Sequence, residues 1–109
     1  MKNLKIRSNE GEPKETYEKW DKEARSILLA IAKWIDEGLE PSSKQVQRLI
    51  EQHHRFAEQF HNASREVYQA MAQLNREHFA YRNQLDPIDP RLAEFMANAM
   101  DCFAQEKLT

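Results

Sequence analysis

A 3.6-residue apolar period runs along most of this sequence and constrains it to fold into helices. It is clearest over 14–37, where the apolar positions are Tyr17, Trp20, Ala24, Ile27, Leu28, Ile31 and Ile35. Gly38 can adopt the left-handed conformation that ends a helix, and Pro41 prevents the helix from resuming. The sequence therefore predicts a first helix over 14–37 that buries one face.

A second helix is predicted to start with a capping box. Ser42 precedes Gln45 by three residues, so each side chain can bond a free backbone amide of the same first turn. The apolar face that follows consists of Val46, Leu49, Ile50, His53, Phe56, Ala57 and Phe60. The pattern fades near Asn62, which marks the expected end of this helix.

A third helix is expected after Ser64. Its buried side should carry Val67, Met71 and Leu74, with Tyr68 beside them. The helical pattern continues as far as Leu85, past a kink that the periodicity does not locate.

The last helix should begin where two prolines end a connection. The residue before a proline avoids the helical region, so 86–90 must be a connection. Asp89 suits the N-cap position and Pro90 the first helical position. The expected inner face consists of Leu92, Phe95, Met96, Ala99 and Phe103, in a helix that runs to about Gln105.

The composition agrees with an all-α fold. Two glycines and four prolines in 109 residues are too few for a turn-rich β protein. Four or five amphipathic helices on short connections predict a compact bundle with globin-like orthogonal packing. Residues 1–13 are polar and are expected to form a flexible N-terminal tail ahead of one helical domain over 14–109.

Charge and motifs exclude several classes of function. A net charge of −2 with both signs mixed gives no footprint for direct nucleic-acid contact. The single cysteine, Cys102, excludes an internal disulfide and suggests a reducing compartment, and the apolar runs are too short to span a membrane. No phosphate loop or hydrolase motif is recognisable. We therefore expect a cytoplasmic protein with no catalytic residues and no cofactor.

Two Glu-x-x-His pairs resemble metal ligands. Glu51 and His54 form the first pair, and Glu58 and His61 repeat it seven residues later. Both pairs lie on one helix, displaced by about 10.5 Å along its axis, so one dinuclear centre cannot use both. A mononuclear site of His54, Glu58 and His61 is geometrically possible, but a solvated flank is the simpler interpretation. The sequence predicts no metal.

His53 differs because it lies in the middle of an apolar face. Two interpretations are open: a core histidine bonded to the backbone, or a polar group that orients a ligand in an apolar pocket. The many aromatic rings and thioethers could line such a pocket, between the second helix and its neighbours. The predicted ligand-binding residues are Trp34, His53, Phe56, Phe60, Tyr68, Met71, Phe79, Phe95 and Met96.

The order of these features resembles the TipA-like antibiotic-recognition domain (TipAS) of MerR-type transcriptional regulators, over about 14–105. The matching elements are Lys14-Glu15-Thr16-Tyr17, Ile35-Asp36-Glu37-Gly38, Pro41 and Ser43, Val46-Gln47, His53, Phe60, Val67-Tyr68, Pro90-Arg91-Leu92-Ala93-Glu94-Phe95 and Ala99-Met100. The resemblance implies globin-like helices around a cleft that captures thiopeptides or other bulky antibiotics.

The family prototype captures its drug covalently through a cysteine just after the second helix. The matching residues, His61, Asn62 and Ala63, include no cysteine. We therefore expect noncovalent binding of a bulky apolar antibiotic or xenobiotic. The chain would act as the drug-sensing effector domain of a MerR-type regulator or as a standalone drug-sequestering resistance protein. The alternative, from another class, is a helical protein–protein interaction module, with a homodimer as one form.

Overall fold

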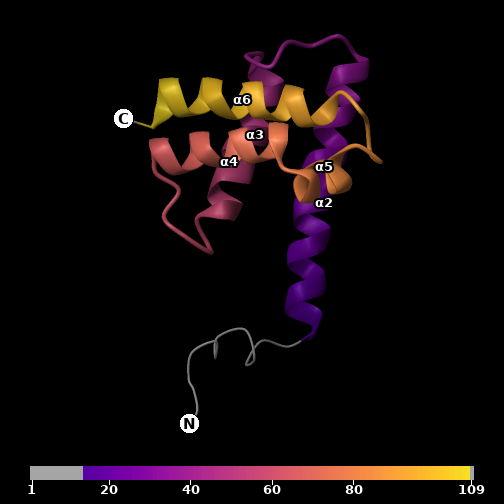
Figure 1. The fold of residues 1–109 in the computed structure, drawn as a ribbon, viewed down its shortest axis with the longest axis vertical. Coiled ribbons are helices and arrows are strands. Elements are labelled where there is room, and N and C mark those ends of the chain that lie inside the picture. The colour runs from indigo at the N-terminus through magenta and orange to yellow at the C-terminus, as the bar shows by residue number, and fades with distance from the viewer. Residues whose placement is uncertain (1–13, 109) are drawn as a thin grey trace.

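The computed structural model describes residues 14–108, and this part of the chain forms five helices and no strand (Figure 1). They are α2 (Lys14–Asp36), α3 (Lys44–Ala57), α4 (Arg65–Glu77), α5 (Phe79–Leu85) and α6 (Leu92–Lys107). In Figure 1, α4 and α6 lie side by side across the view, whereas α2 runs vertically. The predicted all-α bundle is confirmed. The expected tail over 1–13 lies outside the described residues.

α6 is the central helix, because it contacts each of the other four helices and most extensively α4. Its buried side chains are Leu92, Ala93, Met96, Ala97, Ala99, Met100, Phe103 and Ala104. The four alanines let neighbouring backbones approach closely, and the longer side chains fill the space between them. The expected inner face of this helix is confirmed, with Phe95 only partly buried at its edge.

The buried side of α4 differs from the prediction. Val67 and Leu74 are 39% and 38% exposed, whereas Tyr68 and Ala72 are fully buried. α4 carries two apolar stripes, and it packs against alanine-rich α6 through the stripe of Tyr68 and Ala72, with the Tyr68 ring in contact with Phe103. The aliphatic stripe of Val67 and Leu74 is the more hydrophobic by residue type, but the contact with α6 decides which stripe is buried, so the prediction was wrong.

Two predicted helix starts are also corrected. The Ser43 hydroxyl, not that of Ser42, accepts from the Val46 backbone amide at 3.4 Å, so Ser43 is the N-cap and the expected capping box of Ser42 and Gln45 is wrong. A turn closed by the Ser43 amide and the Glu40 carbonyl, 3.0 Å apart, sets this boundary.

At the last helix, Asp89 caps a turn that precedes the helix. Its Oδ1 accepts from the Arg91 amide at 2.8 Å, and its carbonyl accepts from the Leu92 amide at 2.9 Å. Consequently α6 starts at Leu92, two residues after the predicted first position at Pro90.

The remaining breaks follow from local chemistry. Gly38 has a φ of 82°, which confirms the left-handed end expected for the first helix. His78 has extended backbone angles, and its Nδ1 accepts from the Ala80 amide at 3.2 Å. This histidine therefore ends α4 and caps α5, and it is the break that periodicity did not locate.

The first half of α2 projects from the body of the molecule (Figure 1). Ile27 and Ile31, in the second half, are its only buried residues, and Tyr17 near the start is 39% exposed. The Trp20 ring makes an edge contact with Phe60, with ring centroids 4.9 Å apart, and this contact links the projecting half of α2 to the body. Within 14–108 no helix has both the length and the apolarity to cross a membrane.

Candidate functional site

A cavity of about 180 Å³ lies where the helices converge, and each of the five contributes to its wall. The lining residues are Ala24 and Leu28 of α2, His53 of α3, Met71 and Asn75 of α4, Tyr81, Gln84 and Leu85 of α5, and Met96 and Met100 of α6. Three of them are methionines, whose flexible side chains can adapt to different shapes. None is a Lys, Arg, Asp or Glu, so this lining suits an uncharged, largely apolar group.

Three predicted binding residues meet at this cavity: His53, Met71 and Met96. Tyr68 is fully buried and contacts one of them, His53. Its hydroxyl is 2.8 Å from His53 Nδ1 and donates to the Ile50 carbonyl at 3.4 Å. Both contacts are satisfied when His53 Nδ1–H donates to the tyrosine oxygen. The ring is then fixed, with Nε2 left as an acceptor.

The electrostatics keep this imidazole neutral. Burial lowers the pKa of His53 from 6.5 to about 4, and neighbouring His54 adds to the effect. Burial also raises the pKa of the Tyr68 phenol. At neutral pH the pair is therefore uncharged. Nε2 of His53 has no hydrogen-bond partner among residues 14–108, so it can accept a hydrogen bond from a ligand.

His54, the next residue, is the core histidine bonded to the backbone. It is 8% exposed, and its Nε2 donates to the Ala63 carbonyl at 2.8 Å. This hydrogen bond occupies Nε2 of His54, the nitrogen that would bind a metal ion in a mononuclear site with Glu58 and His61. In the described part of the chain, no three His, Cys, Asp or Glu side chains converge as a metal ion requires.

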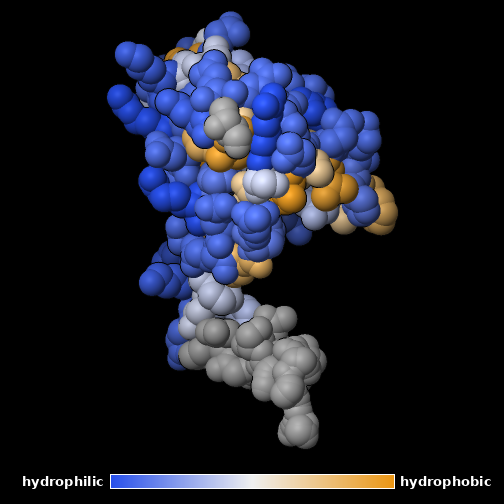
Figure 2. Space-filling view, turned by 90° about the vertical axis from the view of Figure 1, so that its left-hand side faces the viewer, coloured by the Kyte–Doolittle hydropathy of each residue, from blue (hydrophilic) through white to orange (hydrophobic). Residues whose placement is uncertain are grey.

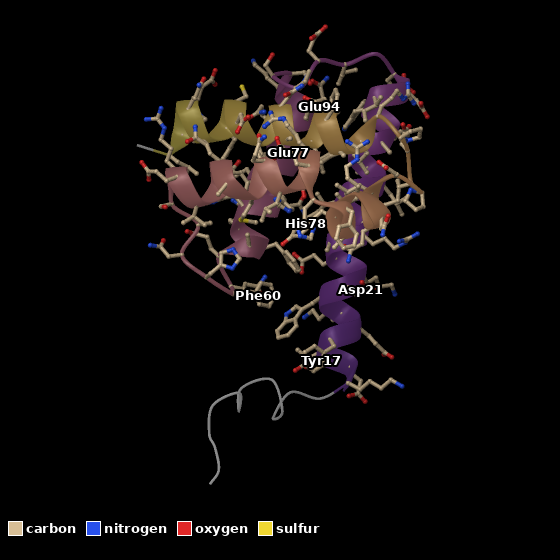
Figure 3. All side chains as sticks on the ribbon, viewed as in Figure 1. Tyr17, Asp21, Phe60, Glu77, His78 and Glu94 are labelled. Atoms are coloured by element: carbon tan, nitrogen blue, oxygen red, sulfur yellow. The ribbon has the colours of Figure 1, made fainter. Side chains whose placement is uncertain are left out.

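Aromatic rings form a chain between α2 and the end of α3, which we call the aromatic rim. Tyr17, Trp20, Phe60 and Phe56 contact one another in that order, with centroids 5.5, 4.9 and 5.3 Å apart. Figure 3 shows Phe60 reaching from the body toward the projecting half of α2, which carries Tyr17. The rim includes Phe56 and Phe60 of the predicted set, and Phe60 is 47% exposed. Trp20 lies one turn from cavity residue Ala24, so the rim and the cavity share one side of α2.

The other three predicted residues lie elsewhere. Trp34 and Phe95 pack, partly buried, against the core. Phe79 is 73% exposed and stacks on His78 at the outer surface, their ring planes 16° apart. The structure does not bring these rings to the cavity.

Sequence reasoning missed several lining residues for two reasons. Ala24 and Leu28 were assigned only to the core, although their spacing from Trp20 marks a continuous stripe. Asn75 and Gln84 are polar, so the apolar periodicity does not include them. Their place in the cavity wall depends on His78, which ends α4 and begins α5. Only the helix arrangement reveals that these residues share a wall.

The described residues form a small, all-helical domain with a cavity between its helices. The model of the TipAS antibiotic-recognition domain family matches residues 5–103, so the chain belongs to this family. This match confirms the resemblance drawn from the sequence. No curated protein and no solved structure matches the chain.

Proposed function

We propose that this protein binds a bulky, largely apolar antibiotic or similar xenobiotic noncovalently. One observation carries the proposal: a neutral His53, held by Tyr68 and with its Nε2 unpartnered among residues 14–108, lines a largely apolar cavity. A buried site of this kind gains affinity from apolar contact and specificity from a single directed hydrogen bond.

The size of the cavity indicates how a bulky ligand would be accommodated. At about 180 Å³ it is smaller than the roughly 300–1,000 Å³ of typical ligand pockets, so it holds one ring-sized group. The rest of the ligand would lie over the aromatic rim, where Trp20 and Phe60 offer large surfaces at low entropy cost. The projecting half of α2 could then close on the bound molecule.

Binding is noncovalent because the site contains no thiol. Cys102 is absent from the cavity wall, and its Sγ is 3.8 Å from a Glu106 oxygen. Burial and Glu106 raise the pKa of this thiol, which disfavours the reactive thiolate.

Two biological roles follow from such binding. The domain would serve as the drug sensor of a MerR-type transcriptional regulator, or it would sequester the drug itself, in either case in the cytoplasm and without touching DNA. Expression of the chain in a drug-sensitive bacterium separates the roles. Sequestration raises the inhibitory drug concentration in proportion to protein level, and a pure sensor does not.

Binding is tested by titration with a panel of bulky antibiotics that includes thiopeptides, followed by tryptophan fluorescence and melting temperature. A ligand at 100 times its Kd should stabilise the fold by about 2.7 kcal/mol. His53→Phe keeps a ring but removes the acceptor, and should weaken binding about tenfold. His61→Ala, at an exposed histidine outside the cavity, is the control. Absence of any shift across the panel would contradict the proposal.

The alternative, a helical interaction module, is favoured by one observation. The outer face of α4 carries a mostly apolar hollow of about 670 Å³ lined by Ala70, Gln73, Leu74, Glu77 and His78, and Phe79 stands beside it. Apolar patches also interrupt the largely hydrophilic surface seen in Figure 2. Light scattering over a range of concentrations tests self-association, which this alternative predicts and the drug-binding proposal does not require.

A further inference from the structure

A second hollow adjoins the cavity at His53. It has a volume of about 420 Å³ and lies between α2 and the segment from α5 to α6. Ala24, Leu28 and Gln84 line both hollows. The two hollows therefore share a boundary, formed by Ala24 and Leu28 of α2 and by Gln84 of α5.

The partition between the two hollows is movable. Ala24 is small and Leu28 stays on the α2 wall, so the element that can open or close the passage is Gln84. Gln84 is exposed and makes no hydrogen bond to another residue within 14–108. Rotation about its side-chain bonds needs no movement of the backbone.

The two ends of the joined space differ in chemistry. The inner end is apolar and has the neutral imidazole of His53. The outer end is lined by Asp21, Arg25 and Asn83, and in the described structure neither Asp21 nor Arg25 forms an ion pair. The outer end can therefore both donate and accept hydrogen bonds.

We propose that the two hollows form one elongated site gated by Gln84, which takes an amphiphilic ligand. An apolar ring lies at His53, and an amide or zwitterionic group lies between Asp21 and Arg25. This inference rests on the proposed drug-binding function and adds to it a second contact region, a direction of binding and a chemical class of ligand.

Two probes that share a ring test the proposal: indole, which is a ring alone, and N-acetyltryptophanamide, which adds amides. Both are titrated into ¹⁵N-labelled protein, and Kd is taken from the shifted backbone amides. Indole should shift only the amides around His53. N-acetyltryptophanamide should also shift those around Arg25 and bind about fivefold more tightly, as one added hydrogen bond allows.

Variants at the gate should act in opposite directions. Gln84→Ala widens the passage and should tighten N-acetyltryptophanamide binding several-fold more than it changes indole binding, because Gln84 lines both hollows. Gln84→Trp fills the passage and should lower the affinity of N-acetyltryptophanamide to that of indole. Arg25→Ala should lower it to the same extent. Gln105→Ala, at an exposed glutamine of α6 that lines neither hollow, is the control and should change nothing.

The outcomes separate this inference from the proposed function. If both probes shift only the amides around His53, and the Gln84 variants bind each probe with the affinity of the wild type, the two hollows are independent. This inference is then wrong, while the proposed drug binding stands. Shifts confined to the Arg25 region would likewise overturn it. If neither probe reaches His53, the cavity does not accept ring-sized ligands, and both proposals fail.

Discussion

At the scale of single residues, two adjacent histidines have opposite roles because their ring nitrogens find different partners. His54 is turned inward to the Ala63 carbonyl and serves the fold. His53 is held by the Tyr68 hydroxyl and lines the cavity, and its other ring nitrogen has no hydrogen-bond partner among residues 14–108. The sequence left both interpretations of His53 open, since the choice depends on a tyrosine fifteen residues further along the chain.

The lowered pKa of His53 predicts a loss of stability in acid. Between the unfolded value of 6.5 and the folded value of about 4, the unfolded chain binds the proton more readily, so stability falls as pH falls through this window. Urea unfolding at pH 7.0 and 4.5 measures the effect. The wild type should lose about 2 kcal/mol more than His53→Phe between the two values. Equal losses would show that burial does not control this histidine.

The bond from Tyr68 to His53 should contribute to stability. Tyr68→Phe leaves the buried ring nitrogen without its partner, and we expect a loss of about 1–2 kcal/mol in urea unfolding. Tyr81→Phe is the matched control, because Tyr81 is 42% exposed and its hydroxyl makes no hydrogen bond to a described residue. A loss as large at Tyr81 would contradict the assignment.

At the scale of helices, the ends and packed faces are set by small polar and small apolar residues. Ser43 and Ser64 cap α3 and α4 through bonds to the third following amide. His78 caps α5 from an extended conformation. These residues fix where each helix begins, and so which side chains it turns toward the cavity.

Neighbouring serines allow a direct test of the α3 cap. Ser43→Ala removes the acceptor for the Val46 amide and should cost about 1 kcal/mol of stability. Ser42→Ala should cost little, because Ser42 is exposed and makes no cap bond. Thermal unfolding of the two variants checks the register, and the reverse order would restore the capping box expected from the sequence.

The α4–α6 contact predicts different effects for two alanines of one helix. Ala72 is fully buried against the core, so Ala72→Leu should overpack it and cost about 1–3 kcal/mol. Ala70 is exposed on the outer side of α4, and Ala70→Leu should be nearly neutral. Chemical unfolding measures both variants, and a loss at Ala70→Leu as large as that at Ala72→Leu would contradict the buried side assigned to α4.

Periodicity predicted the helices well and the site only in part. The stripe over 14–37 and the turn at Gly38 depend on local spacing, which the sequence displays directly. The face of α4 and the start of α6 depend on how closely two helices approach, which spacing does not encode. His53, Met71 and Met96 line the cavity and lie on apolar stripes, whereas Gln84 also lines it but is polar and follows the break at His78, so local spacing gives no sign of it.

At the scale of the whole molecule, the five helices of this TipAS-family chain converge on one small cavity. α6 supplies a rigid centre, and α2 extends beyond the body with aromatic rings on one side. In the proposed mode of binding, the inner cavity takes one ring-sized group and the aromatic rim takes the rest of the ligand. We expect binding to be most sensitive to changes at His53 and less sensitive at the rim.

In the proposed function, a drug-sized molecule places part of itself inside this cavity. Three of the four methionines, Met71, Met96 and Met100, line it, and Met1 lies outside the described residues. The most direct measurement is a ¹³C-methyl methionine NMR spectrum during titration with an antibiotic that raises the melting temperature. The account predicts saturable shifts of the Met71, Met96 and Met100 methyl signals at the same ligand concentration. Unchanged signals from these three methyl groups, while the melting temperature rises, would place the ligand elsewhere and contradict the account.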